Sequence, residues 1–100
     1  MNDKFMSMIG FAKRARKIVY GIDTLENTKQ LKLLAVSDSA SDNLVNSMKN
    51  LAEKRHLPLV TAEGLETKVG GNCKALGITD ENMALAMIEY VKGGAQGYKI

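Results

Sequence analysis

The sequence predicts an α/β protein: a three-layer α-β-α sandwich with a four-stranded mixed sheet, in which helix and strand alternate. Three observations lead to this prediction. Stretches with apolar residues at helical spacing alternate with short apolar runs of strand length. The connections between them are short, and 100 residues with 45% apolar content can bury a single core. We therefore expect one domain over residues 1–94, followed by a loosely ordered tail over residues 95–100.

The first third of the chain predicts a helix, a strand and a second helix. A helix is expected over residues 3–16, because apolar residues recur on one face of it. These core-facing residues are Phe5, Met8, Ile9, Ala12 and Ala15. Residues 17–20 then predict a short strand, which Gly21 ends. Asp23 is expected to cap the second helix, since Glu26 follows it at the spacing of a capping box.

The middle of the chain predicts a central strand and an amphipathic helix. Residues 33–36 form a continuous apolar run, as expected for a strand that is buried on both faces. The helix that follows has one apolar face and one polar face. Its apolar residues are Leu44, Val45, Met48, Leu51 and Ala52. It should end near His56, because Pro58 disfavours helical geometry at the residue before it.

Two strands and two helices complete the predicted sandwich. Residues 59–62 and 75–79 have the composition of strands. Between them we expect a short helix over residues 63–69, and Gly70-Gly71 is typical of a helix C-cap. Asp80 should cap the last helix. The predicted buried face of that helix consists of Ala84, Met87, Ile88 and Val91.

Positive charge is concentrated in the first third of the chain. Residues 1–32 hold seven Lys or Arg and three acids, whereas residues 33–100 hold seven and eight. Four of these cations fall within five residues: Lys13, Arg14, Arg16 and Lys17. Such a cluster before a glycine turn suits the binding of a phosphate backbone. It could equally be a solvated helix end whose cations complement the helix dipole, and the sequence leaves both interpretations open.

The sequence offers little for catalysis or metal binding. It holds one Cys and one His, so neither an internal disulfide nor a Cys/His metal site is expected. We interpret Cys73 as an unreactive thiol and His56 as a solvated or capping residue, and we interpret Asp38 and Asp42 as caps near a helix start. The predictions are no enzyme, no cofactor and no metal. Because no apolar run could span a membrane, we expect a cytoplasmic protein without a membrane partner.

Four segments together have the order and spacing of a known family. They are residues 9–17 followed by Gly21, residues 37–43, residues 65–70 and residues 74–80. They resemble the leading helix and basic turn, the polar loop after the second strand, the segment before the RNA-facing loop, and the final strand with its helix cap. The family is the L-seven-Ae / L-thirty-e superfamily of ribosomal and kink-turn RNA-binding proteins, and the chain looks most like its bacterial YlxQ-like branch. The resemblance implies an α/β domain that binds structured RNA without catalysis.

The resemblance also implies an RNA face that joins the start of the second helix to the loop before the fourth strand. There, Thr24 and Leu25 are expected to offer unpaired backbone N–H groups. With the basic cluster, the candidate RNA-binding residues are Lys13, Arg14, Arg16, Lys17, Gly21, Asp23, Thr24, Asn27, Gly71, Asn72, Cys73 and Lys74. The chain departs from the family at Asp23, Thr24 and Asn27, which stand where the family has Asn, Glu and Lys. Asp23 could accept from a guanine or only cap the helix, and residues 70–74 could contact RNA or form a plain turn.

The expected function is binding of structured RNA, in the form of a kinked duplex, within the ribosome or another ribonucleoprotein. The partners implied are RNA and ribosomal or other ribonucleoprotein components. The alternative is a protein-interaction module on the same fold that has lost kink-turn specificity. The basic cluster should contact phosphates rather than base edges. If it does not, the helix before Pro58 offers Lys49, Lys54 and Arg55 instead.

Overall fold

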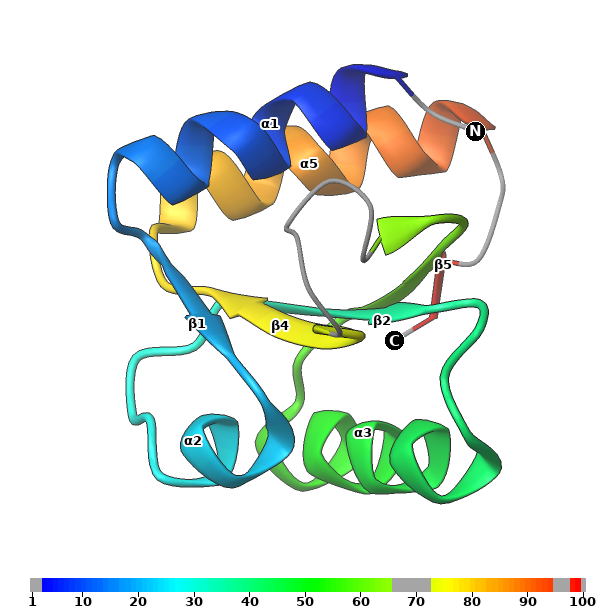
Figure 1. Cartoon of the computed structure of the whole chain (residues 1–100). Coiled ribbons are helices and arrows are strands. Elements are labelled where there is room, and N and C mark those ends of the chain that lie inside the picture. The colour runs from blue at the N-terminus through cyan, green and yellow to red at the C-terminus, as the bar shows by residue number, and fades with distance from the viewer. Residues whose placement is uncertain (1–2, 66–72, 95–97, 100) are drawn as a thin grey trace.

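The predicted three-layer α/β arrangement is what the structure shows (Figure 1). This computed structural model describes residues 3–65, 73–94 and 98–99. Two helices, α1 (Asp3–Arg14) and α5 (Glu81–Gly94), cover one face of the sheet. The other face is covered by α2 (Ile22–Glu26) and α3 (Asp42–Arg55). Within the described residues no helix is long and apolar enough to cross a membrane.

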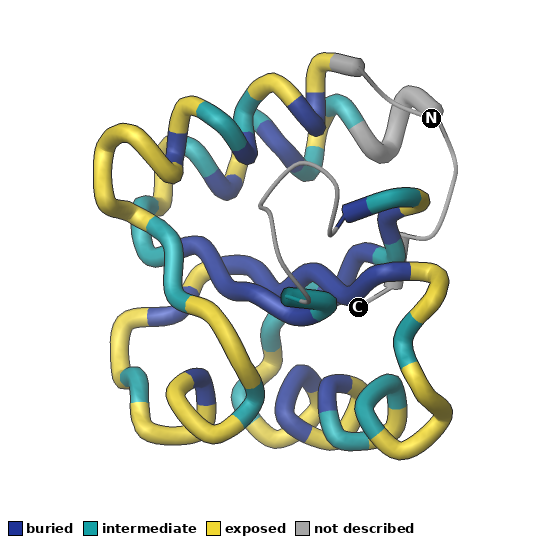
Figure 2. Tube along the Cα trace, viewed as in Figure 1, coloured by how far each residue is buried: buried dark blue, intermediate teal, exposed yellow. Residues whose placement is uncertain are grey.

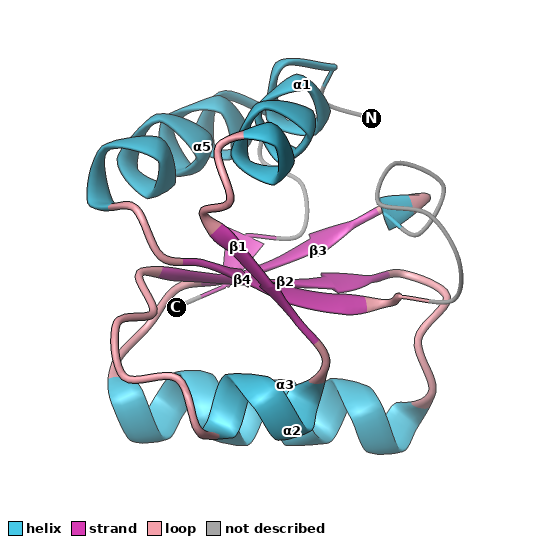
Figure 3. Ribbon diagram, turned by 60° about the vertical axis from the view of Figure 1, so that its left-hand side comes forward, coloured by secondary structure: helices cyan, strands magenta, loops and turns pink. Residues whose placement is uncertain are grey.

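The sheet is mixed, and its strands lie in the order β1-β4-β2-β3-β5. The strands are β1 (Ile18–Tyr20), β2 (Leu33–Ser37), β3 (Leu59–Ala62), β4 (Ala75–Ile78) and β5 (Tyr98–Lys99). Strand β2 is parallel to β3 and antiparallel to β4, and β4 is also antiparallel to β1. Strands β1, β2 and β3 therefore run in the same direction, and their carboxyl ends lie at the same edge of the sheet (Figure 3).

Strand β5 is an addition to the four strands that the sequence predicts. It lies in the tail that was expected to be loosely ordered, and it pairs with β3 through Val60–Tyr98 and Leu59–Lys99. A two-residue strand has no periodicity by which a sequence could reveal it. It forms at the outer side of β3, where the backbone groups of an edge strand would otherwise lack partners.

The prediction of a central strand buried on both faces is confirmed for β2. All five of its residues are buried. Leu33 and Ala35 contribute to the core beneath α1 and α5, whereas Leu34 and Val36 contribute to the core over α2 and α3. Figure 2 shows this strand as part of a buried layer between the two helical layers. A strand that feeds two cores has no polar face, which is why its sequence shows no alternation.

The predicted core face of α1 is largely confirmed. Phe5, Ile9 and Ala12 are buried, and Met8 is partly buried against them. Ala15 is exposed, so its assignment to the core is wrong. The reason is that α1 ends at Arg14, two residues earlier than predicted, and Ala15 already belongs to the turn.

Two of the predicted helix ends are confirmed. His56 forms the C-cap of α3 in a left-handed conformation, and Asp80 caps α5 by accepting from the Met83 N–H at 2.9 Å. The prediction for Asp42 is wrong, because Ser41 is the N-cap of α3 and accepts from the Leu44 N–H at 3.2 Å. Asp38 is no helix cap either; its carboxylate accepts from the Gly64 N–H at 3.3 Å.

The prediction that Asp23 caps α2 is also wrong. The helix begins one residue earlier, at Ile22, and its N-cap is Gly21, which makes no side-chain cap bond. Gly21 has a φ of 86°, a conformation that glycine adopts without steric cost. With this start, Leu25 is the fourth helical residue, and its N–H donates to the Gly21 carbonyl at 2.9 Å. The expectation that this N–H is unpaired is therefore wrong.

Gly77 lets the layer of α2 approach the sheet closely. A Cβ built at this position would lie 2.6 Å from Cδ2 of Leu25 and 2.6 Å from Cδ2 of Leu31. Both leucines are buried. A side chain at this position of β4 would therefore require both leucines to move.

Some predictions concern parts of the chain that the structure does not describe. The helix predicted over residues 63–69 lies outside the described residues beyond residue 65, as do Gly70-Gly71 and Asn72. In α5, Ala84 and Met87 are buried and Ile88 is partly buried, as predicted. The side chain of Val91 lies outside the described part.

Candidate nucleic-acid interface

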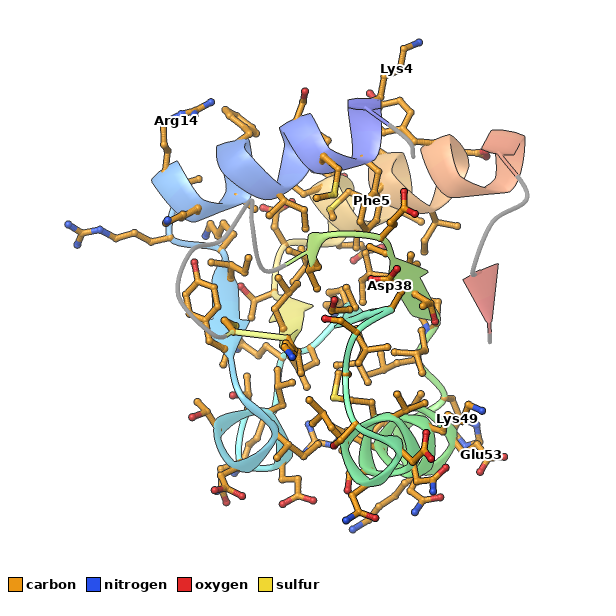
Figure 4. All side chains as sticks on the ribbon, turned by 45° about the vertical axis from the view of Figure 1, so that its right-hand side comes forward. Lys4, Phe5, Arg14, Asp38, Lys49 and Glu53 are labelled. Carbon is orange, nitrogen blue, oxygen red and sulfur yellow. The ribbon has the colours of Figure 1, made fainter. Side chains whose placement is uncertain are left out.

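The basic cluster occupies the turn that joins α1 to β1. The Lys17 N–H donates to the Ala12 carbonyl at 2.9 Å, and the Arg16 N–H donates to the Lys13 carbonyl at 3.2 Å. With Arg16 at a φ of 60°, these bonds form a Schellman motif, which reverses the chain at a helix end. The turn brings together Lys13, Arg14, Arg16 and Lys17, all of them exposed. Figure 4 shows Arg14 pointing away from the body of the protein.

Backbone hydrogen bonds fix this turn at one edge of the sheet. The Lys17 carbonyl accepts from the Thr79 N–H at 3.0 Å, next to the end of β4. On the other side of β4, the Lys32 N–H donates to the Ile78 carbonyl at 2.8 Å. The turn therefore lies at the edge where β1 and β2 begin and β4 ends (Figure 1, left).

Further connections with cations reach the same edge. The connection from α2 to β2 carries Lys29 and Lys32, and both are exposed. The end of α3 carries Lys54 and Arg55, and the segment after it reaches this edge, because the Leu34 N–H donates to the Pro58 carbonyl at 3.0 Å. We call this surface the basic edge. It consists of Lys13, Arg14, Arg16, Lys17, Lys29, Lys32, Lys54 and Arg55.

Acids lie among these eight Lys or Arg: Asp80 and Glu81 follow β4, Glu26 ends α2, and Glu53 precedes Lys54 in the last turn of α3. Lys29 and Lys32 belong to the charge excess of residues 1–32, but sequence patterns do not place them beside the four cations of the α1–β1 turn. The strand order places them there. Because only β4 lies between β1 and β2, the segments that lead into these two strands lie close together.

Five of the other candidate residues that the structure describes lie at the opposite edge of the sheet: Gly21, Asp23, Thr24, Cys73 and Lys74. The Gly21 N–H donates to the Ala75 carbonyl at 3.1 Å, so the start of α2 lies beside the segment that leads into β4. Four residues separate Gly21 from Lys17 along β1, which is about 13 Å at about 3.3 Å per residue. The structure thus separates these five residues from the four cations of the α1–β1 turn.

Two side chains at the end of α2 donate to backbone carbonyls at its start. Asn27 Nδ2 donates to the Asp23 carbonyl at 2.9 Å. Thr28 Oγ1 donates to the Thr24 carbonyl at 2.8 Å. The carboxylate of Asp23 and the side chain of Thr24 are exposed. Gly71 and Asn72, which the resemblance places beside them, lie outside the described residues.

Acidic side chains surround this second group. They come from the connections that follow β1, β2 and β3. We call this surface the acidic edge, and its charged residues in the described part of the chain are Asp23, Asp38, Asp42, Glu63 and Lys74. The one cation among them is Lys74, whose Nζ donates to the Ser39 carbonyl at 3.4 Å. A polyanion at this edge would meet repulsion from the carboxylates.

Cys73 lies at the acidic edge and is partly buried. Its Sγ donates to the Ala75 carbonyl at 3.3 Å. Burial raises the pKa of the Cys73 thiol above its ordinary value. Burial, and secondly the nearby Cys73, raises the pKa of Tyr20 as well. Because the thiolate is the reactive form, the raised pKa agrees with the interpretation of Cys73 as an unreactive thiol.

Comparison with known proteins adds support for the fold. The chain matches no family model and no curated protein. It is similar to the solved structure of a protein of unknown function from Bacillus halodurans, with a TM-score of 0.77 and 18% sequence identity. The match covers 89% of this chain and 97% of that chain. At this sequence identity the similarity shows a shared fold and gives no evidence about function.

Proposed function

We propose that this protein binds structured RNA without catalysing a reaction, and that the basic edge holds the phosphates. The observation that carries the proposal is the exposed turn with Lys13, Arg14, Arg16 and Lys17. Long, flexible cations that share one turn suit phosphates, whose contacts position a nucleic acid without reading its sequence. Because acids lie at the opposite edge, the charge distribution is asymmetric, and a polyanion is attracted to the basic edge.

The backbone of Arg16 supports a functional role for the turn. Its φ of 60° lies in the left-handed region, where glycine is the usual residue at a helix end. A side chain there strains the backbone by about 1–2 kcal/mol. Strained residues of this kind cluster at functional sites. An arginine at such a position is explained if its charge is needed at this place.

The resemblance to the L-seven-Ae / L-thirty-e superfamily supports RNA over other polyanions and favours a kinked duplex. On this proposal the protein acts in the cytoplasm, within the ribosome or another ribonucleoprotein. The second candidate is a protein-interaction module that has lost kink-turn specificity. It is favoured by the carboxylates of Asp23, Asp38 and Glu63, which occupy the edge that the resemblance assigns to RNA.

Crosslinking in cells followed by sequencing of the attached RNA tests the proposal directly. A defined set of structured RNAs supports it, and recovery of no RNA above an uncrosslinked control overturns it. In vitro, affinity should be measured across a salt series for a kinked duplex and for a straight duplex. Phosphate binding predicts a steep fall with salt, because each contact releases counterions. Equal affinity for both duplexes would exclude kink-turn recognition, and a flat salt dependence would favour the protein-interaction module.

A further inference from the structure

Building on the proposed RNA binding, we infer that the RNA site extends from the α1–β1 turn to the connection between α2 and β2. Lys29 and Lys32 contact phosphates there, and the RNA lies along the basic edge instead of the acidic edge. This site differs from the one that the resemblance implies, which joins Gly21 to the segment around Lys74.

The spacing across the sheet brings the two connections within reach of one RNA. Lys17 and Lys32 hydrogen-bond to β4 from its two sides. Their backbones are thus two strand spacings apart, which is about 10 Å. Both side chains are exposed, as is that of Lys29. Cations from two chain segments therefore lie on the two sides of the end of β4, which Asp80 and Glu81 follow.

Helix dipoles do not explain Lys29 and Lys32. Cations in the last turn of a helix complement its dipole, and Lys13, Arg14 and Lys54 occupy such positions. The effect falls off beyond the last turn. Helix α2 ends at Glu26, so Lys29 and Lys32 stand three and six residues beyond it. Their charge at this edge has no role in stabilising that helix.

Arg55 holds the connection that carries these lysines. Its guanidinium donates to the carbonyls of Glu26 and Thr28, which lie just before Lys29. These two hydrogen bonds of the Arg55 guanidinium link the end of α3 to the connection between α2 and β2. A connection that is fixed in this way presents its lysines in a defined place, which lowers the entropy lost when they bind.

A second observation marks the same edge. Within the described residues, the non-glycine residues with positive φ are Arg16, at 60°, and His56, at 55°. Both close a Schellman motif at the basic edge: the His56 N–H donates to the Glu53 carbonyl at 3.3 Å, and the Leu57 N–H to the Ala52 carbonyl at 2.9 Å. Glycine is usual at both positions. Both residues thus close helices at this edge, and Arg16 places a cation where glycine is usual.

The test compares two double variants with the same net charge. One replaces Lys29→Gln and Lys32→Gln, and the control replaces Lys4→Gln and Lys92→Gln. Lys4 lies at the opposite end of α1 from Arg14 (Figure 4), and Lys92 lies near the end of α5, whose start at Glu81 is at the basic edge. Binding of a fully paired RNA duplex is measured across a salt series. A third variant replaces Lys13, Arg14, Arg16 and Lys17 by Gln, and melting curves check that every variant folds.

If the RNA lies along the basic edge, the Lys29 and Lys32 double variant should lower the salt slope by about two, because each lost phosphate contact lowers it by about one. The control should keep the slope of the wild type. The extension would be overturned if the Lys29 and Lys32 double variant had the same slope as the control while the quadruple variant had a reduced slope. That result would still support the proposed function. Unchanged slopes in both would overturn the extension together with RNA binding at this edge.

Discussion

Replacing Arg16 by glycine should raise stability and weaken RNA binding at the same time. Arg16 holds a φ of 60° at the end of α1. A side chain in this conformation costs about 1–2 kcal/mol. Glycine avoids that cost but loses about 0.5–1 kcal/mol more backbone entropy on folding. The expected net gain in the free energy of unfolding lies between about 0 and 1.5 kcal/mol, and its midpoint of about 0.75 kcal/mol corresponds to about 3–6 °C in Tm for a domain of this size.

The RNA measurement should move in the opposite direction. Arg16→Gly removes one cation from the α1–β1 turn, so the salt slope for a paired RNA duplex should fall by about one. Arg16→Gln is the matched control, because it removes the same charge while keeping a side chain in the left-handed conformation. It should lower the slope equally and leave Tm near that of the wild type. Thermal unfolding by circular dichroism and binding by fluorescence anisotropy give the two quantities.

Two results would refute this reasoning separately. If Arg16→Gly melts below the wild type, the left-handed conformation carries no strain that glycine relieves. If both variants keep the wild-type salt slope, Arg16 contacts no phosphate, and its conformation has no functional explanation. A substitution that raises stability and weakens binding is typical of a residue that is retained for function although its conformation is unfavourable.

Four other predictions test the core and the acidic edge. Leu34→Ala should lower the free energy of unfolding by about 2–5 kcal/mol, because Leu34 is fully buried in the central strand; a loss within error in urea unfolding would place it at the surface. Gly77→Ala should cost about 1–3 kcal/mol by overpacking, and an unchanged melting curve would show that its neighbours move aside. The pH–rate profile for alkylation of Cys73 should be shifted to higher pH than that of a free cysteine, because its raised pKa leaves less thiolate at a given pH; a midpoint at or below the free value would contradict this. Asp23→Ser should not weaken binding to a kinked duplex, and a loss of about 1–3 kcal/mol for that duplex alone would show that Asp23 reads a base.

The sequence could predict the layers of the fold because burial leaves a periodic trace. The uninterrupted apolar run at Leu33–Val36 indicates a strand between two cores, and the structure buries all of it. The helical spacing of Met48, Leu51 and Ala52 likewise predicts the buried face of α3. The exact first and last residues of a helix are harder to predict from sequence. Gly21 rather than Asp23 is the N-cap of α2, because the positive φ that the turn requires outweighs the capping preference of a carboxylate.

The division of the candidate site into two edges could not be predicted from local patterns. Lys17 and Gly21 are close in sequence, and a chain read residue by residue suggests one site. They lie at opposite ends of β1, and each is joined to a different end of β4 by a backbone hydrogen bond. Strand order and direction are long-range properties. They decide which loops meet, and neither periodicity nor spacing reports them.

The two edges also differ in how much of their charge local physics explains. Acids in the first turn and cations in the last turn stabilise any helix, and this accounts for Asp42 at the start of α3 and Lys54 at its end. A sandwich whose parallel strands are followed by helices collects such acids at one edge and such cations at the other, so some polarity arises without a ligand. Lys29 and Lys32 lie outside this account, because they follow α2 at a distance where its dipole no longer acts. Whether the basic edge serves RNA or only the helices is therefore decided at these two lysines.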